Sequence, residues 1–149
     1  QTRTHIFRIF KNDPQLKKHV TFLGKIKFDD LSAYYANADI LLHPSWLDPC
    51  PNVVVEALAC GLPVVCPSTG GTPELVAKGG IIVEDSFDFG FTEQYNNVPK
   101  IDYDKYKEAV LEIYDNLEKY SSRARQQAET KLDIDIVSKK YINVIKKYC

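Results

Sequence analysis

Short, unbroken apolar runs separated by helix-start signals most constrain the fold of this 149-residue chain. The runs lie at residues 40–43, 63–67 and 81–83. Strands that read as continuous apolar stretches are typical of a parallel sheet covered on both faces. A helix start follows each of the first two runs, at Asn52 and at Thr72. The pattern therefore predicts an α/β fold built from βα units.

The N-terminal residues fit this pattern less regularly. Residues 20–23 form an apolar run that ends at Gly24, which predicts a further strand. Asp29 or Asp30 then predicts the cap of a helix whose apolar positions include Tyr34 and Tyr35. Residues 1–10 fit helical spacing slightly better than strand alternation, and both readings stay open.

The C-terminal third predicts helices. From Tyr103 onward two apolar stripes recur at helical spacing, and we expect both to dock onto the sheet layer. The stripes are Tyr106, Val110, Ile113 and Leu117, and Val137, Tyr141, Val144 and Tyr148. We interpret residues 1–149 as a single domain, with a βα core over 1–100 and C-terminal helices over 101–149. Between them, residues 85–101 carry four aromatic rings without a period, which favours a packed surface loop over an aromatic contact for a substrate or partner.

The charge balance excludes a general attraction to nucleic acid, because 19 basic and 20 acidic residues leave a net charge of -1. The chain contains no apolar run long enough to span a bilayer, and we expect a cytoplasmic protein. The last predicted helix carries lysines that would allow contact with an anionic membrane at its cytoplasmic face, although a solvated polar face is the simpler interpretation. Those lysines are Lys139, Lys140, Lys146 and Lys147.

Cysteine and histidine positions indicate neither a metal site nor a disulfide framework. The four cysteines show no C-x-x-C spacing, and the three histidines are scattered. Cys60 and Cys66 lie in apolar surroundings and are expected to be packing residues in a reducing compartment. The chain has no methionine, so Gln1 is not a translation start, and we expect a fragment.

Two carboxylates eight positions apart, Asp48 and Glu56, flank a predicted strand-to-helix junction. We expect Asn52 to cap the helix and Glu56 to lie in its first turn. Free amides near Val53 and Val54 would present partial positive charge to an anion, while Glu56 could accept hydrogen bonds from two neighbouring ribose hydroxyls. Each residue alone is a common turn, cap or dipole feature. Together they stand in the order that places ligand groups at the carboxyl ends of parallel strands, which suits a nucleotide-sugar pocket.

Several ordered motifs resemble a known family. They read VTFLG at 20–24, DLSAYYANAD at 30–39, HPS at 43–45, PNVVVEALACGLPVV at 51–65 and GGTPELV at 70–76. These residues resemble the nucleotide-binding C-terminal half of the group 1 retaining glycosyltransferases of GT-B architecture. The resemblance is close over residues 20–83 and implies a Rossmann-like parallel sheet with flanking helices and a helical C-terminal tail.

The resemblance implies transfer of a sugar from a nucleoside diphosphate sugar to a hydroxyl of a glycan or lipid acceptor, with retention at the anomeric carbon. No metal and no further cofactor is implied. Glu56 matches the acid that holds the ribose hydroxyls. Asp48 matches the acid that contacts the donor sugar, where the family has a glutamate whose side chain is about 1.5 Å longer.

Other positions match binding segments of the family. The backbone at Lys25 and Ile26 corresponds to the part that lines the base, and the amides of Asn52, Val53 and Val54 correspond to phosphate contacts. Gly70, Gly71 and Glu74 resemble the loop that closes the same cleft.

The chain also departs from the family. An Arg and Lys pair for the diphosphate, with its strands, is not identifiable before residue 20, and the acceptor half is absent. We therefore expect weak nucleotide affinity from this chain alone. Loss of those strands would leave a gap in the sheet, which we expect the opening segment or another chain to fill.

Two functional hypotheses follow from these residues. The first is the donor-binding part of a retaining glycosyltransferase, inactive as this fragment because its partner half is missing. The alternative is a non-catalytic sugar- or protein-binding module that kept the fold. A sugar-nucleotide epimerase on the same architecture is disfavoured, because the helix entry at Asn52 resembles the transferase pattern.

Overall fold

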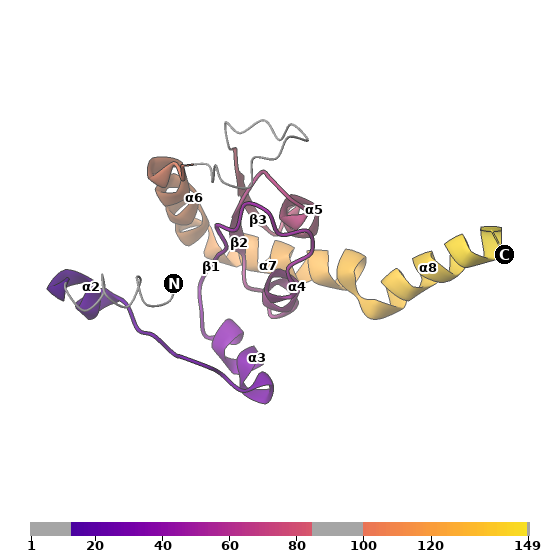
Figure 1. Ribbon diagram of the computed structural model, residues 1–149, viewed down its shortest axis with the longest axis horizontal. Helices are drawn as coiled ribbons and strands as arrows, with labels where there is room; N and C mark the ends of the chain where they lie inside the picture. The colour runs from indigo at the N-terminus through magenta and orange to yellow at the C-terminus, as the bar shows by residue number, and fades with distance from the viewer. Residues whose placement is uncertain (1–12, 85–99, 149) are drawn as a thin grey trace. The chain divides into compact units, whose positions relative to one another are not determined.

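The computed structural model describes residues 13–84 and 100–148 (Figure 1). The chain divides into two compact units, Gln1–Leu31 and Ser32–Cys149, and each is considered by itself. The opening residues 1–10 and the aromatic stretch between 85 and 99 lie outside the described residues, so the expectations for both stay predictions.

The described part of the first unit holds helix α2 (Pro14–His19) and the start of α3 (Phe28–Ala36). Asp13 caps α2, because its Oδ1 accepts hydrogen bonds from the amides of Gln15 at 2.9 Å and Leu16 at 3.3 Å. The prediction of a strand at residues 20–23 is wrong, since these residues do not form one. A strand requires a ladder partner, and no described segment pairs with them.

The predicted start of α3 is also displaced. The helix begins at Phe28, so Asp29 and Asp30 lie within its first turn and neither is the cap. Acidic side chains there still complement the helix dipole. The helix continues into the second unit, where Tyr35 lies close to its end.

The second unit is built on a three-stranded sheet of β1 (Leu41–Leu42), β2 (Val64–Pro67) and β3 (Gly80–Val83). The strands run parallel in the order β1-β2-β3, which confirms the predicted α/β fold. Pairing of Leu41 with Val64, and of Val64 with Gly80, sets the register. The loops after β1 and β2 consequently leave the sheet at the same edge.

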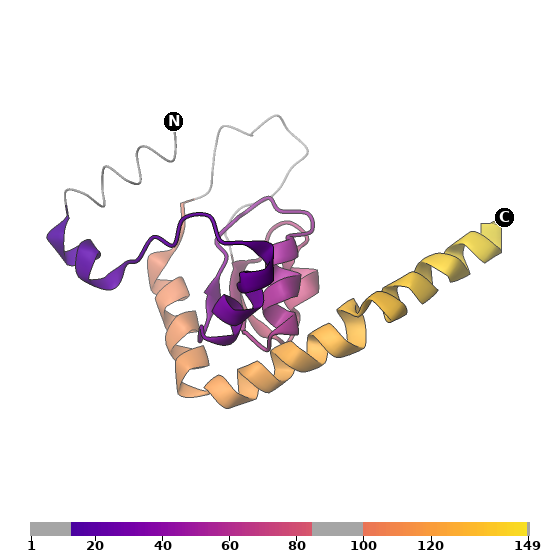
Figure 2. The ribbon, with the colours of Figure 1, turned by 90° about the horizontal axis from the view of Figure 1, so that it is seen from below.

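Helices follow the strands and then complete the unit (Figure 2). Helix α4 (Asn52–Ala59) lies between β1 and β2, and α5 (Thr72–Val76) lies between β2 and β3. The C-terminal helices expected from Tyr103 are confirmed. They are α6 (Tyr103–Asp115), α7 (Leu117–Gln127), a π-helical turn η1 (Ala128–Leu132) and α8 (Ile134–Tyr148).

Two apolar clusters cover opposite faces of the sheet. Val64 and Cys66 of β2 belong to one cluster, with side chains from α4, α5 and α7, while Val65 belongs to the other, with α6. The largest buried partners are Val54, Leu58 and Val76 on the first face and Tyr106 and Ile113 on the second. All four residues of β2 are buried. The structure therefore has the doubly covered sheet that the unbroken apolar runs predicted.

Only one of the two C-terminal apolar stripes packs on the sheet. The stripe of Tyr106 and Ile113 packs on the sheet as expected. The expectation for the stripe on α8 is wrong, because no residue of α8 is buried and Tyr141 and Tyr148 are 68% and 75% exposed. In both views α8 extends away from the sheet beyond η1 (Figures 1 and 2). No helix among the described residues is long and apolar enough to cross a membrane.

None of the three described cysteines forms a disulfide with another of them. Cys66 is buried, as expected, whereas Cys60 is half-buried and Cys50 is exposed. Over the same residues no group of three or more His, Cys, Asp or Glu side chains is arranged to hold a metal ion.

Ile113 provides a test of the packing between α6 and the sheet. Its side chain is fully buried, so Ile113→Ala should lower the free energy of unfolding by about 2–5 kcal/mol. Leu111 on the same helix is 50% exposed, and Leu111→Ala should cost less than about 1 kcal/mol. Urea denaturation of both variants measures the difference. Equal losses would contradict the assignment of the apolar face of α6.

Candidate functional site

The loops that follow β1 and β2 pack closely against each other. The Gly71 amide donates a hydrogen bond to the carbonyl oxygen of Asp48 at 2.9 Å. A Cβ on Gly71 would lie 1.9 Å from the carbonyl oxygen of Pro49, and one on Gly70 would lie 2.8 Å from that of Asp48. Gly70 also has a φ of 77°, which favours glycine. The structure therefore brings together two of the segments that the sequence singled out separately.

The Asp48 side chain interacts with its own loop. Its Oδ1 accepts a hydrogen bond from the Cys50 amide at 3.3 Å, as in an Asx turn. Its Oδ2 lies 3.8 Å from Nε2 of His43, the residue that follows β1. One third of the Asp48 side chain remains exposed. The carboxylate thus shapes the loop and stays partly accessible to solvent.

The start of α4 differs from the expectation in one detail. Pro51 occupies the N-cap position and Asn52 is the first helical residue, so Asn52 is not the cap. The carbonyl oxygen of Pro51 accepts hydrogen bonds from the amides of Val54 at 3.1 Å and Val55 at 3.4 Å. The amides of Asn52 and Val53 have no acceptor among the described residues. Of the three amides expected to face an anion, two remain available.

Glu56 lies slightly farther along α4 than expected. It is the fifth residue of the helix, and the first turn contains no acidic side chain. Because Cα–Cβ bonds tilt toward the N-terminus of a helix, the side chain leaves the backbone toward the end of α4 that carries the free amides. Glu56 is half-buried, so its carboxylate is neither sealed in the core nor fully in solvent.

Helix α3 supplies a partner for the Glu56 carboxylate. The Tyr35 hydroxyl donates a hydrogen bond to Oε2 of Glu56 at 3.0 Å. Cys60, the C-cap residue that follows α4, places its Sγ 4.0 Å from the carbonyl oxygen of Ser32 on α3. The two helices therefore contact each other at two successive turns.

The pKa of Tyr35 is raised to about 12 by burial first, and then by the hydrogen bond and the charge of Glu56. The phenol therefore stays protonated and remains a donor at neutral pH. Sequence reasoning placed Tyr35 on an apolar stripe and missed this role. The signal that was available is its polar tip, since a partly buried tyrosine hydroxyl generally finds an acceptor.

Three polar side-chain atoms that lack a hydrogen-bond partner in the described part of the chain lie in the same loops and at the start of α5. Nε2 of His43 and the hydroxyls of Thr69 and Thr72 are buried and have no hydrogen-bond partner among the described residues. His43 follows β1, whereas both threonines follow β2. Buried polar groups are usually satisfied, so these atoms mark this edge of the sheet as a place where a polar ligand or water would bind.

The remaining predicted residues are not joined to this arrangement by any described contact. Glu74 is exposed in the first turn of α5, two residues after Thr72. Lys25 and Ile26 precede α3 in the first unit, where Lys25 is exposed and Ile26 is half-buried. Their contacts with a cleft and a base stay predictions.

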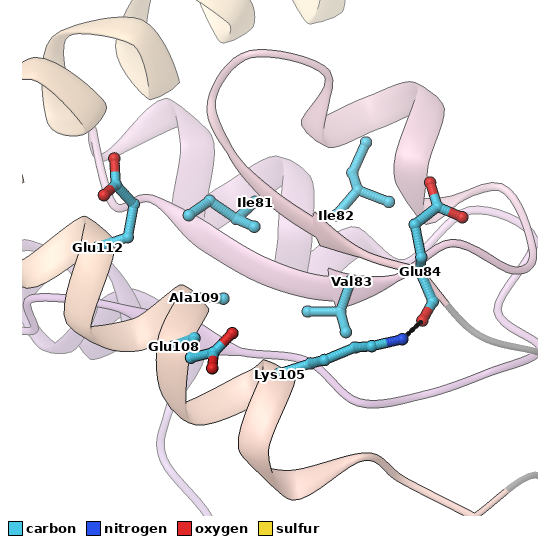
Figure 3. A pocket seen from close by; sticks show the side chains of 8 residues that line it. All are labelled: Ile81, Ile82, Val83, Glu84, Lys105, Glu108, Ala109 and Glu112. Atoms are coloured by element: carbon cyan, nitrogen blue, oxygen red, sulfur yellow. Dashed lines mark hydrogen bonds between the residues drawn. The ribbon is translucent and has the colours of Figure 1, made fainter.

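A cavity of about 390 Å³ opens elsewhere, between β3 and α6 (Figure 3). Ile81 and Val83 form its apolar floor, and three glutamates surround them. Lys105, the cation of this lining, donates a hydrogen bond from Nζ to the carbonyl oxygen of Glu84 at 3.2 Å. An acidic lining repels a diphosphate, so this cavity does not suit the ligand that the loops suggest.

Sequence comparison identifies the family to which this chain belongs. The family model described as "Glycosyl transferases group 1" matches residues 4–116. The chain belongs to this family.

A curated relative and two solved structures show how much of a whole protein the chain covers. Spore coat protein SA of Bacillus subtilis is 29% identical over 137 residues, which are 88% of this chain and 33% of that protein. Sucrose-phosphate synthase from Thermosynechococcus elongatus superposes with a TM-score of 0.75 at 21% identity, over 98% of this chain and 34% of that one. HepE of Anabaena, in complex with UDP-glucose, superposes with a TM-score of 0.70 at 22% identity, over 97% of this chain and 36% of that one. The chain thus spans about a third of the length of each of these three proteins.

The contact between the two loops can be tested at Gly71. Any residue can adopt its φ of -91°, so the loss of stability in Gly71→Ala comes from the clash of the new Cβ with the Pro49 carbonyl. We expect a loss of about 1–3 kcal/mol in the free energy of unfolding. Lys78→Ala, at an exposed position shortly after α5, should change it by less than about 0.5 kcal/mol. A Gly71→Ala variant as stable as the parent in urea denaturation would contradict the packing.

The bond between Tyr35 and Glu56 predicts a dependence of stability on alkaline pH. The folded state binds the phenol proton more tightly than the unfolded state, whose pKa is 10.0. Its contribution is therefore fully present below pH 10 and declines as the pH rises toward about 12. Tyr35→Phe should reduce this decline, whereas Tyr34→Phe, at a position 46% exposed, should not. Urea denaturation across this pH range measures the free energy of unfolding of each variant. Identical pH profiles for the two variants would refute the role of the bond between Tyr35 and Glu56.

Proposed function

We propose that this chain is the donor-binding part of a retaining glycosyltransferase. The observation that carries the proposal is the half-buried Glu56 carboxylate, which accepts a hydrogen bond from Tyr35 and lies on α4, the helix whose first two amides have no acceptor among the described residues. The whole enzyme would move a sugar from a nucleoside diphosphate sugar to a hydroxyl of a glycan or lipid acceptor. Family membership supports this class of reaction.

Each part of the donor would meet a different group of the chain. The amides of Asn52 and Val53, together with the dipole of α4, would face the diphosphate. Glu56 would accept hydrogen bonds from the ribose hydroxyls, since a carboxylate can serve two adjacent donors. Asp48, on the loop beside them, would face the donor sugar.

We propose roles for the other predicted residues in the whole enzyme. The Gly70-Gly71 loop and Glu74 would close over the donor, and the backbone at Lys25 and Ile26 would line the base. Support for the loop is its direct contact with the Asp48 segment.

The chemistry would depend on positioning and on stabilising the diphosphate as it leaves. Holding the donor sugar and the acceptor hydroxyl next to each other lowers the barrier, because their translational freedom is removed before the reaction. Amide donors aimed at the leaving group stabilise the negative charge that develops there. We propose that the chain needs no metal and uses no nucleophile of its own.

We further propose that the acceptor-binding half lies outside this chain, so that the chain alone does not catalyse transfer. The support is its span of about a third of the relatives' length. We propose a cytoplasmic location, with α8 in peripheral contact with an anionic membrane. Its four lysines are exposed together with apolar side chains such as Tyr141 and Ile145, a composition suited to an interface.

Nucleotide titration tests the proposal. Calorimetry of the full-length protein with UDP, GDP and ADP should show binding of at least one, and Glu56→Ala should weaken it at least tenfold, or about 1.4 kcal/mol. Glu108→Ala, which removes an exposed carboxylate beside the other cavity, should leave the affinity unchanged. Lack of response to all three nucleotides would favour a non-catalytic binding module instead.

A further inference from the structure

The carboxylate proposed to hold the ribose is itself held by a residue 21 positions earlier in the chain. The Tyr35 hydroxyl donates to Oε2 of Glu56, and the other carboxylate oxygen, Oε1, has no partner among the described residues. An ionised carboxylate offers about four acceptor sites on its two oxygens. One donated hydrogen bond therefore orients the group and leaves most of its acceptor capacity open.

We propose that Tyr35 is a positioning residue that fixes the Glu56 carboxylate for two adjacent ribose hydroxyls and so makes the site selective for ribonucleotides. This inference rests on the proposed donor-binding function. A free glutamate side chain samples many rotamers, and a ligand that needs one of them must oppose that freedom. A bond already present in the unliganded protein removes this cost before the nucleotide arrives.

The surroundings of Tyr35 make it suited to this role. Its ring packs against the apolar cluster that contains Val54 and Leu58, so the hydroxyl projects from a fixed base. The neighbouring contact between Cys60 and Ser32 joins the same two helices without the phenol. Removal of the hydroxyl alone should therefore free the carboxylate while the packing of α3 on α4 persists.

The chain provides two matched controls. Tyr34 is the adjacent residue of α3 and is 46% exposed, so Tyr34→Phe removes a hydroxyl from the same helix. Tyr120 donates a hydrogen bond to Oε1 of Glu112 at 3.3 Å, which is a second tyrosine–glutamate pair formed by α7 and α6. Tyr120→Phe therefore reproduces the loss of such a bond at a position outside the proposed site.

The experiment measures the affinity of the full-length protein for the ribonucleotide that binds, among UDP, GDP and ADP, and for its 2′,3′-dideoxy analogue. Tyr35→Phe should weaken ribonucleotide binding by about 5- to 20-fold and leave dideoxynucleotide binding within about twofold. Selectivity for the ribose hydroxyls should fall accordingly. Tyr34→Phe and Tyr120→Phe should change neither affinity. In a Glu56→Ala background, Tyr35→Phe should have no further effect.

The alternative outcomes separate this inference from the proposed function. If Tyr35→Phe weakens both nucleotides equally, the residue has a purely structural role and the inference is wrong. If Glu56→Ala weakens binding while Tyr35→Phe matches Tyr34→Phe, the proposed function stands and the inference alone fails. If no nucleotide binds, or Glu56→Ala has no effect, both are overturned.

Discussion

The parallel ladder on both sides of β2 is the interaction on which the second unit depends. All four residues of this strand are buried, and alternate side chains enter the two apolar clusters on opposite faces. The strand also pairs with β1 along one edge and with β3 along the other, so both edges and both faces of β2 are occupied within the unit. Because the strands are parallel, the loops after β1 and β2 emerge at one edge, and this places Asp48 beside Gly71.

The candidate site is assembled from three segments that meet at this edge. The loop after β1 provides Asp48, the start of α4 provides two free amides and Glu56, and the loop after β2 packs against the first through its glycines. Helix α3 adds the Tyr35 hydroxyl. None of these groups would be sufficient alone, since each has an ordinary structural explanation. The contact between the two loops, together with buried polar atoms there that lack a hydrogen-bond partner among the described residues, is what supports a ligand site.

Local patterns predicted elements well where the partners of an element lie within the described chain. The strand after residue 40, the strand ending at Pro67 and the helix over 52–59 all form, because burial and stop signals coincide there. The segment 20–23 has the composition of a strand but no described neighbour to pair with, so propensity alone does not order it. The stripe on α8 likewise indicates an apolar face without indicating what covers it. Helix starts were displaced by one to three residues, as at Asn52, where the Pro51 carbonyl begins the bonding instead.

The sequence by itself determined the order of strands and helices, the parallel sheet and the motifs that place the chain in its family, because these depend on local periodicity and on stop and cap residues. Only the tertiary structure decided that Tyr35 meets Glu56 and that Gly71 fits against Pro49. The first contact joins residues 21 positions apart, and its formation depends on how two helices pack. No local preference encodes a contact between residues so far apart in the sequence, because the contact follows from the packing of the whole sheet and its register.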